Sequence, residues 1–483
     1  MNNYDVIVIG GGVVGGMILR ELTRYELKVL MVEKNCDVAM GQSKANSGIV
    51  HAGFDAETGT NKAKFNVLGA NMMQEVCEEL GVNYKNNGSL VVAFSKEDIK
   101  TLKVLLKRGK KNGVKNLKII AKKELKALEP NISDDALGAL YAKSACIVCP
   151  YSLTIASIGN AMDNGADLLV DFDTVKVERD GEYTKLTASD GREVLGKIII
   201  NSAGAGAESI ANLFGDYSFK TGLRRGEYML LDRESGNLVN HTLFFTPSAK
   251  GKGVLVTQTV DGNILLGPTS VEDGNPIPET TDEGFAFIKE KASQMCKSVP
   301  YYNVITSFAG NRAFCDRHDF IIEESKAYKG LINLAGIESP GLTSAPAIAK
   351  YVVNEMVLKI KYAYVNHYFI RKRYSIDNLF QKPFKELTIE EKNFVIKKDK
   401  NYGKIICRCE GITEGEIRNA IRQNPPARTV DGVKLRTRAG MGRCQGGFCQ
   451  SRIVEILAEE NGVSVLEITK NGKGSEILVE EGK

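Results

Sequence analysis

The sequence has 483 residues, of which 43% are hydrophobic and 25% are charged, with a formal net charge of +5. This length exceeds what one hydrophobic core usually serves, so two or three domains are expected. The small positive excess does not indicate a nucleic-acid partner. No apolar stretch approaches a membrane span of ~18 residues, the run at 6–9 is too short for a signal peptide, and ten cysteines are too few for a secreted disulfide scaffold. A cytoplasmic protein is therefore expected.

The first segment predicts a β-α-β unit with a nucleotide-binding turn. Gly10, Gly12 and Gly15 form a GxGxxG pattern directly after a strand-like run and at the start of a helical one, and Glu33 ends the next strand-like run. Glycines let the backbone approach a pyrophosphate at the helix N-terminus, and an acid about 20 residues further on accepts ribose hydroxyls. The pattern predicts an ADP-containing cofactor, FAD or NAD. The alternative is a glycine-rich turn in an ordinary α/β sheet.

Strand and helix signals then alternate to about residue 361, with strand-like runs at 88–94, 173–180, 197–204, 227–232 and 262–268. Residues 362–401 are rich in lysine and aromatic residues and poorly periodic, which favours an inter-domain connection. The basic stretches 103–118 and 369–374 are interpreted as solvated faces, with docking to an acidic partner or to lipid headgroups at the membrane periphery as the alternative.

The Gly-, Ser- and Asn-rich loop GQSKANSGIVHAGFD at 41–55 resembles the second flavin-contacting segment of the D-amino-acid oxidase superfamily. Its NSGxxHxG pattern is most similar to anaerobic glycerol-3-phosphate dehydrogenases and L-2-hydroxyglutarate dehydrogenases. Three further segments match this superfamily in the same order, namely IIINSAGAGA at 198–207, FAGNRA at 308–313 and GIESPGLTSAPAIA at 336–349. The resemblance implies that the dinucleotide is FAD.

The same resemblance implies a fold class and a set of cofactor contacts. The expected fold is α/β, with a Rossmann-like FAD-binding domain (about 1–90, 145–215 and 330–365) interleaved with an α+β substrate domain that has an antiparallel sheet (about 91–144 and 216–329). A linker at 366–400 and a small, mostly helical four-cysteine domain at 401–483 follow. The expected FAD contacts are Gly10, Gly12, Gly15, Glu33, Lys34, Ser43, Asn46, Ser47, Gly48, Val175, Ala203, Gly204, Gly310, Gly341, Leu342 and Thr343.

Arg312 and His51 are the first candidates for substrate chemistry. The planar guanidinium of Arg312 suits a carboxylate or phosphate, and its matched position faces the flavin in the superfamily. His51 lies inside the flavin-contacting loop, where it would act as a base, as a polariser or as a contact to the ring, with a structural role as the alternative. His318, just after the arginine segment, is a weaker substrate-binding candidate, with loop packing as its alternative.

A second cationic segment lies in LRRGEYMLLD, which is interpreted as a loop entering a strand. The arginine pair Arg224 and Arg225 would meet an anionic substrate there, and Arg225 and Tyr228 are taken as substrate-binding candidates. Ordinary ion pairing of these arginines is an equally acceptable alternative.

Four cysteines near the end of the chain predict an all-sulfur metal site. Cys407 and Cys409 form a CxC pair, and Cys444 and Cys449 follow after a spacer of 34 residues with four residues between them. Such a set suits zinc or an iron-sulfur cluster, but zinc pairs usually have two to four residues between ligands. The surrounding ICRCEGITEGEI and RTRAGMGRCQGGFC resemble the bacterioferritin-associated-ferredoxin type of 2Fe-2S domain. A 2Fe-2S cluster is predicted, with zinc as the alternative.

Together these features predict an FAD-dependent dehydrogenase acting on a small anionic alcohol. The resemblance favours oxidation of sn-glycerol 3-phosphate to dihydroxyacetone phosphate, with electrons passed to the 2Fe-2S cluster, to a second redox subunit or to a flavoprotein acceptor. The alternatives are a dehydrogenase of an L-2-hydroxy acid, of an amino acid or of a secondary amine, and an electron-transfer subunit without turnover of its own.

Overall fold

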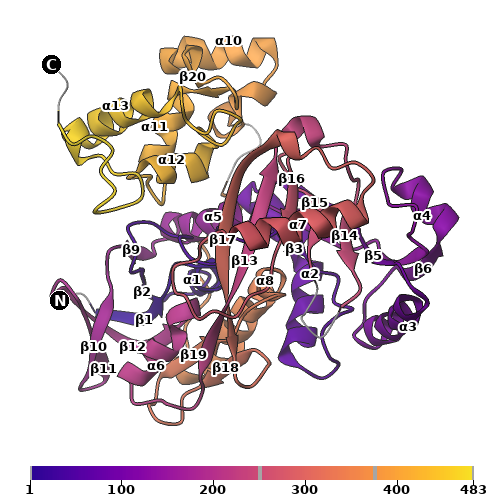
Figure 1. The fold of residues 1–483 in the computed structure, drawn as a ribbon. Coiled ribbons are helices and arrows are strands. Elements are labelled where there is room, and N and C mark those ends of the chain that lie inside the picture. The colour runs from indigo at the N-terminus through magenta and orange to yellow at the C-terminus, as the bar shows by residue number, and fades with distance from the viewer. Residues whose placement is uncertain (1–2, 248–252, 374–377, 481–483) are drawn as a thin grey trace.

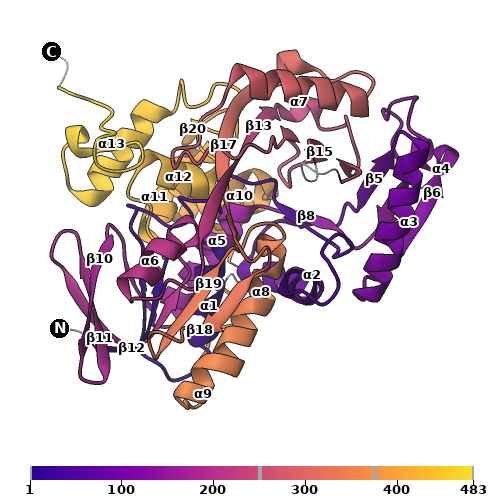
Figure 2. The same cartoon turned by 60° about the horizontal axis from the view of Figure 1, so that its bottom comes forward.

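The structure, a computed structural model, describes residues 3–247, 253–373 and 378–480. Two large sheets and a smaller C-terminal module make up the molecule (Figure 1). The module lies against the first sheet's side of the molecule, and the far end of the second sheet, with α3 (Lys96–Lys111) and α4 (Lys122–Leu128), lies away from it in Figures 1 and 2. Among the described residues, no helix combines the length and the apolar character needed to cross a membrane.

The first sheet has the strand order β10-β11-β12-β1-β2-β9, and β19 joins β12 beside β18. The pairs that β1 makes with β12 and β2 are parallel, as are β2 with β9 and β12 with β19, whereas β10, β11 and β12 pair antiparallel. The strands are β1 (Asn3–Ile9), β2 (Val29–Val32), β9 (Asp167–Leu169), β10 (Thr174–Asp180), β11 (Tyr183–Ala188), β12 (Glu193–Asn201), β18 (Ile321–Glu324) and β19 (Leu331–Ala335).

Both faces of β1, β2 and β19 are buried, which explains their continuous apolar runs. Along β1, Val6 and Val8 pack into one core and Ile7 and Ile9 into another. The first core holds α1 (Val13–Leu22), α5 (Pro150–Asp163), α8 (Gly341–Val352) and part of α2 (Asn61–Leu80), and the second holds α6 (Ala207–Leu213). A π-helical turn links α8 to α9 (Leu358–Ile360). Helices on both faces of a largely parallel sheet are the doubly wound arrangement predicted for the nucleotide domain.

The second sheet has the order β17-β13-β16-β15-β14-β5-β7-β6 and is antiparallel except for the pair of β14 and β5. Apolar residues of β5 alternate between a core under α4 and α7 and a core under α3. The elements are β5 (Ser89–Ala93), β6 (Leu117–Ala121), β7 (Gly138–Ala142), β13 (Thr221–Leu231), β14 (Thr242–Phe245), β15 (Leu255–Gln258), β16 (Ile264–Gly267), β17 (Val304–Cys315) and α7 (Asp282–Met295). A third, small sheet pairs β8 (Cys146–Val148) with β3 (Ile49–Val50) and β4 (Tyr84–Lys85).

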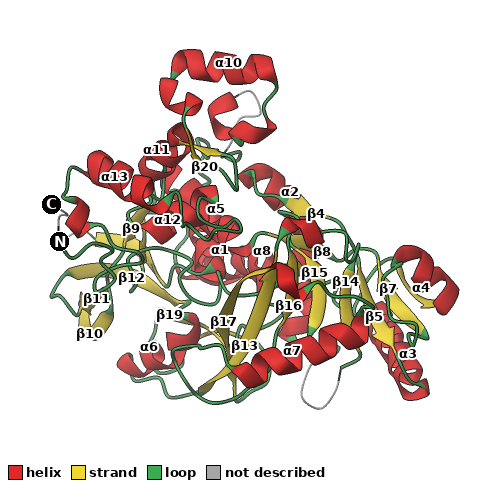
Figure 3. Cartoon of the chain, turned by 45° about the horizontal axis from the view of Figure 1, so that its top comes forward, coloured by secondary structure: helices red, strands yellow, loops and turns green. Residues whose placement is uncertain are grey.

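The C-terminal module has its own core beneath α11 (Glu414–Arg422), α12 (Val430–Thr437) and α13 (Gln450–Asn461), beside a two-stranded ribbon of β20 (Ile405–Cys407) and β21 (Ile412–Thr413). The expected linker at 366–400 differs from the structure. Residues 389–398 form α10 (Ile389–Lys398), which begins with a capping box between Thr388 and Glu391 and packs through Val395 on Phe384 and Tyr402. Figure 3 shows α10 at the outer edge of the module, so this part of the segment belongs to the module.

Candidate functional site

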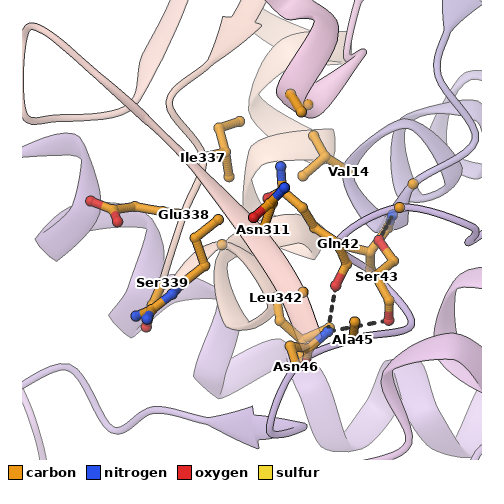
Figure 4. A pocket seen from close by; sticks show the side chains of 18 of the residues that line it. Val14, Gln42, Ser43, Ala45, Asn46, Asn311, Ile337, Glu338, Ser339 and Leu342 are labelled. Atoms are coloured by element: carbon orange, nitrogen blue, oxygen red, sulfur yellow. Dashed lines mark hydrogen bonds between the residues drawn. The ribbon is translucent and has the colours of Figure 1, made fainter. Parts of the chain in front are cut away.

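A cavity of about 1070 Å³ lies between the two large sheets. Its volume exceeds the upper end of the roughly 300–1,000 Å³ typical of small-molecule sites, so an extended ligand fits. Most of the expected cofactor contacts line it: Gly10, Gly12, Glu33, Lys34, Ser43, Asn46, Ser47, Val175, Ala203, Gly204, Gly310, Gly341 and Leu342. In Figure 4, Gln42 and Ser43 lie to the right and Glu338 and Ser339 to the left, with Leu342 between them.

The glycine turn between β1 and α1 has the geometry that a dinucleotide requires. Gly10 has φ +106°, and a Cβ there would lie 2.6 Å from the carbonyl oxygen of Ser202. Gly15 does not line the cavity. A Cβ at Gly15 would lie 2.2 Å from the carbonyl oxygen of Gly10, so this glycine lets α1 pack closely on the turn.

Glu33 stands at the end of β2 and joins the turn to the loop that follows. Its Oε2 accepts a hydrogen bond from the Gly11 N–H at 2.6 Å, and its Oε1 accepts from the Asn35 N–H at 2.9 Å. The Asn35 Nδ2 also donates to Oε1, at 2.6 Å. An ionised carboxylate has about four acceptor positions, so Oε2 keeps one for a ribose hydroxyl. The residues present therefore fit an adenine dinucleotide.

The loop at 42–48 completes this side of the site. The Ser43 Oγ accepts from the Val13 N–H at 2.9 Å and so caps α1 from a distance, because Gly12 at the N-cap has no side chain. The Asn46 Nδ2 donates to the carbonyl oxygens of Gln42 at 2.9 Å and Ser43 at 3.2 Å, as drawn in Figure 4. Its Oδ1 accepts from the Gly48 N–H at 2.9 Å. The Asn46 amide thereby fixes the turn that leads to His51.

His51 faces the cavity from the end of this loop. Its backbone N–H donates to the Thr343 Oγ1 at 2.9 Å, its carbonyl accepts from the Asn66 Nδ2 at 2.6 Å, and its Nε2 lies 3.2 Å from the Ser339 Oγ. Thr343 itself does not line the cavity. The threonine instead positions the backbone of His51. Gly48 also lies behind the cavity lining, and a Cβ at this position would lie 2.4 Å from the Val148 carbonyl oxygen.

Arg312 and Arg224 face each other across the pair of β13 and β17, and both line the cavity. The Arg312 Nη2 donates to the Thr269 carbonyl oxygen at 2.9 Å, while its buried Nε has no hydrogen-bond partner among the described residues. Arg224 is paired with Glu272 at 2.5 Å and Glu338 at 3.3 Å. An unpaired buried guanidinium N–H is costly, which makes Arg312 the side chain best prepared to bind an anion.

Tyr228 lies four residues after Arg224 along β13 and also lines the cavity. Its ring stacks on Phe308 with centroids 4.8 Å apart. Burial raises the pKa of Tyr228, and the Arg312 charge and a hydrogen bond with Ser47 oppose that rise. The phenol therefore stays protonated at neutral pH beside the guanidinium.

Two of the expected substrate contacts lie outside the cavity lining. Arg225 does not line the cavity, because 221–231 is a strand and not the expected loop, and successive side chains of a strand point to opposite faces. Its Nε lies 3.1 Å from Asp273 and its Nη2 3.6 Å from the buried Glu227. His318 is exposed in a turn with φ +56° and lies outside the cavity lining. Lys62, which sequence analysis did not select, lines the cavity with its Nζ 2.9 Å from Glu338.

The four predicted metal ligands lie together in the C-terminal module as two close thiol pairs. The Sγ atoms of Cys409 and Cys444 are 3.5 Å apart, and a hydrogen bond from Cys449 lowers the pKa of Cys407 to about 6. Among the described residues, no three Cys, His, Asp or Glu side chains come close enough to hold one metal ion. Two thiol pairs suit a two-iron cluster, in which each iron takes two cysteines, better than one zinc ion inside four sulfurs.

Glycine lets the second cysteine loop approach the first pair. A Cβ at Gly442 would lie 2.3 Å from the Cβ of Cys409, so no other residue fits between the two loops. Gly440 and Gly446 have φ +88° and +94°, which lets the chain wrap around Cys444. The donor set and this cradle fit a 2Fe-2S cluster.

Buried arginines join the module to the flavin side of the molecule, and sequence analysis did not find them. Arg436 on α12 makes a bidentate pair with Asp37, four residues beyond Glu33, at 2.7 and 2.9 Å, and both side chains are buried. Arg438 contacts Asp261 at 2.6 Å and Glu410 at 3.0 Å. The cysteine module is thus fixed to the loop that follows the nucleotide strand.

Comparison with known proteins identifies the class to which this fold and site belong. Residues 5–355 match the FAD dependent oxidoreductase family, and the chain belongs to that family. Residues 405–459 match the BFD-like [2Fe-2S] binding domain. The predicted fold class, FAD and the 2Fe-2S cluster are thereby confirmed.

Particular relatives narrow the comparison. The chain is 48% identical over 478 residues to glycerol 3-phosphate dehydrogenase of Caloramator mitchellensis, with 98% of each chain covered. It is 33% identical over 370 residues to glycerol 3-phosphate oxidase of Mycoplasma genitalium, covering 75% of this chain and 96% of the relative. The solved structure of dithionite-reduced L-α-glycerophosphate oxidase from Mycoplasma pneumoniae with FAD bound superposes with a TM-score of 0.74 at 29% identity, covering 77% of this chain and 98% of that one.

Proposed function

We propose that the protein oxidises sn-glycerol 3-phosphate to dihydroxyacetone phosphate. The proposal rests mainly on Arg312. Its buried guanidinium has an Nε without a hydrogen-bond partner among the described residues, and Arg312 lines the same cavity as His51. Two relatives that cover most of this chain are named for the same substrate, which supports the choice of a phosphate over a carboxylate.

Arg312 binds the phosphate group and thereby orients the substrate. Its Nη2 is held by the Thr269 carbonyl oxygen, so the guanidinium plane is fixed before the substrate arrives. Arg224 and Lys62 add positive charge to the same cavity, although both are partly neutralised by Glu338. A preorganised guanidinium loses little entropy on binding, which favours tight binding of the phosphate dianion.

His51 accepts the hydroxyl proton. Oxidation of the secondary alcohol removes one hydride from carbon and one proton from oxygen, and FAD supplies the hydride acceptor when it is bound. The His51 Nε2 lies at the cavity, 3.2 Å from the Ser339 hydroxyl, and the backbone of His51 is held on both sides by Thr343 and Asn66. A positioned base of this kind typically contributes about 10²–10⁴ to the rate.

Cys407, Cys409, Cys444 and Cys449 would hold the 2Fe-2S cluster, which would supply one-electron transfer to an outside acceptor. A separate redox protein serves as that acceptor. All ten cysteines are free thiols in the structure, which supports a cytoplasmic location, where thiols stay reduced.

The test is anaerobic mixing of purified protein with glycerol 3-phosphate while the flavin absorbance is followed. We expect bleaching within the mixing time of a manual experiment, and none with glycerol, which lacks the phosphate that Arg312 binds. Bleaching by L-2-hydroxyglutarate or L-proline but not by glycerol 3-phosphate would contradict the proposal.

A further inference from the structure

The cysteine loops expose one aromatic and one cationic side chain beside the cluster ligands. Phe448, between Cys444 and Cys449, is 85% exposed, and Cys409 is exposed although it is a cluster ligand. Arg408 lies between the first two cysteines, is exposed and has no carboxylate partner within the described part of the chain. A cluster held here therefore lies directly beneath the protein surface.

The oxidoreductase domain extends the same surface. Arg443, next to Cys444 and 58% exposed, contacts Asp232 at 3.3 Å and Glu234 at 2.5 Å. The Asp232 N–H donates to the Asn303 carbonyl oxygen at 2.8 Å, and Tyr302, the preceding residue, is 89% exposed. Only four large apolar or aromatic side chains among the described residues exceed 80% exposure, and Tyr302 and Phe448 are two of them. Tyr302 is thus the neighbour of Asn303, which bonds to Asp232, the residue that Arg443 contacts.

We propose that this surface, which we call the carrier face (Tyr302, Arg408, Cys409, Arg443 and Phe448), docks an acidic one-electron carrier protein. The inference rests on the proposed function, because it concerns where the electrons of that reaction leave. The unpaired charge of Arg408 at the cluster edge favours an acidic partner. The apolar part is only two side chains, which suits the small, transient interfaces of electron-transfer proteins and not the larger, more apolar interface of a permanent subunit.

The electron balance fixes the stoichiometry at this face. Oxidation of one alcohol releases two electrons and two protons, and each docked carrier accepts one electron. Two oxidised carriers are therefore reduced in turn for each substrate, and each must leave before the next can dock. Weak binding with fast release is what the small carrier face supplies.

Binding can be tested without turnover. The probe is a plant-type ferredoxin, an acidic protein, with gallium in place of iron, titrated into the complete holoprotein and followed by NMR. We expect binding that weakens as salt is added, because charge attraction between exposed groups is screened. Arg408→Glu is expected to raise the dissociation constant roughly tenfold at low salt, and Phe448→Ser to raise it at low and at high salt. Phe394→Ser is the matched control, since Phe394 is 50% exposed on α10 and lies outside the carrier face.

A second measurement separates this inference from the proposed function. With native ferredoxin, both variants should slow substrate-driven ferredoxin reduction while glycerol 3-phosphate bleaches their flavin at the wild-type rate. Loss of bleaching in the wild type would count against the proposed function alone. Absence of ferredoxin binding to the wild type, equal binding by the variants, or a stable dimer of the wild type that Phe448→Ser abolishes would overturn the carrier face.

Discussion

The flavin side of the molecule and the cysteine module are built in opposite ways. The cavity collects residues from positions 9 to 342 of the sequence, brought together by strands of two sheets. The four cysteines lie within 43 residues of sequence, on loops beside one small core. A site assembled from distant segments depends on the packing of the whole domain, whereas a site on neighbouring loops depends on glycines that allow close approach. Damage to the cysteine loops should therefore stay local.

Removing one cluster ligand gives the largest expected effect and the sharpest test of that contrast. Cys444→Ser should reduce bound iron from about two per chain to near zero, because a 2Fe-2S cluster needs four protein ligands. FAD content and flavin bleaching by substrate should persist. Iron analysis and the flavin spectrum of the same anaerobic sample measure both, with Cys36→Ser as a control at a half-buried cysteine outside the set. Simultaneous loss of FAD would show that the two sites are not independent.

Within the flavin side, Arg312→Ala should raise the Michaelis constant for glycerol 3-phosphate by about 10- to 100-fold. This corresponds to losing a hydrogen bond to a charged group, worth roughly 1.5–3 kcal/mol. FAD content should change little, since Arg312 reaches Thr269 and not the glycine turn. Steady-state kinetics with an artificial acceptor provides the measurement.

Arg225→Gln is the control on the neighbouring residue, whose side chain points to the other face of β13. Its Michaelis constant should remain near the wild-type value. Equal effects of the two substitutions would mean that the cavity does not bind the substrate as proposed.

The last expected effect is on FAD retention and not on catalysis, and it concerns the contact between the two regions. Arg436→Ala leaves Asp37 buried without its partner, which typically costs about 3–5 kcal/mol. Urea should then release FAD at a lower concentration than in the wild type, as followed by flavin fluorescence. The double variant Asp37→Asn with Arg436→Met should lose less than the two single variants together, because no buried charge remains.

Arg422→Ala is the matched comparison, because Arg422 is 64% exposed in its pair with Glu460. Exposed pairs are worth about 0–1 kcal/mol, so FAD release should shift little. A wild-type release profile for Arg436→Ala would show that the module does not stabilise the nucleotide loop.

The sequence predicted the parts of the site that depend on spacing along the chain. The glycine turn with Glu33 and the four cysteines are such patterns, and the structure gathers each set. Arg224 and Arg225 could not be separated, because only the pairing of β13 with β17 decides which face meets the cavity. The pair of Asp37 and Arg436 was equally beyond reach, since no local pattern links residues 399 positions apart.

One difference between the expected and the observed structure, the helix α10, could have been predicted from the sequence. Thr388 and Glu391 have the spacing of a capping box, which indicates the start of a helix, yet residues 366–400 were expected to form a linker. Because the segment is rich in lysine, its apolar periodicity is weak, and the helix was not predicted. Val395, Phe384 and Tyr402 give α10 a small core of its own, which spacing within the helix alone does not reveal.

Asp37 and Arg436 also constrain how the protein is made. Domains generally fold from the N-terminal side during synthesis, so the strand-turn-helix of residues 3–22 and the acid behind it emerge long before the arginine 399 positions later. Until then the Asp37 carboxylate is hydrated, and the loop around it lacks the ion pair with Arg436. Capture of the nucleotide in its final form is consequently a property of the finished polypeptide and not of the growing one.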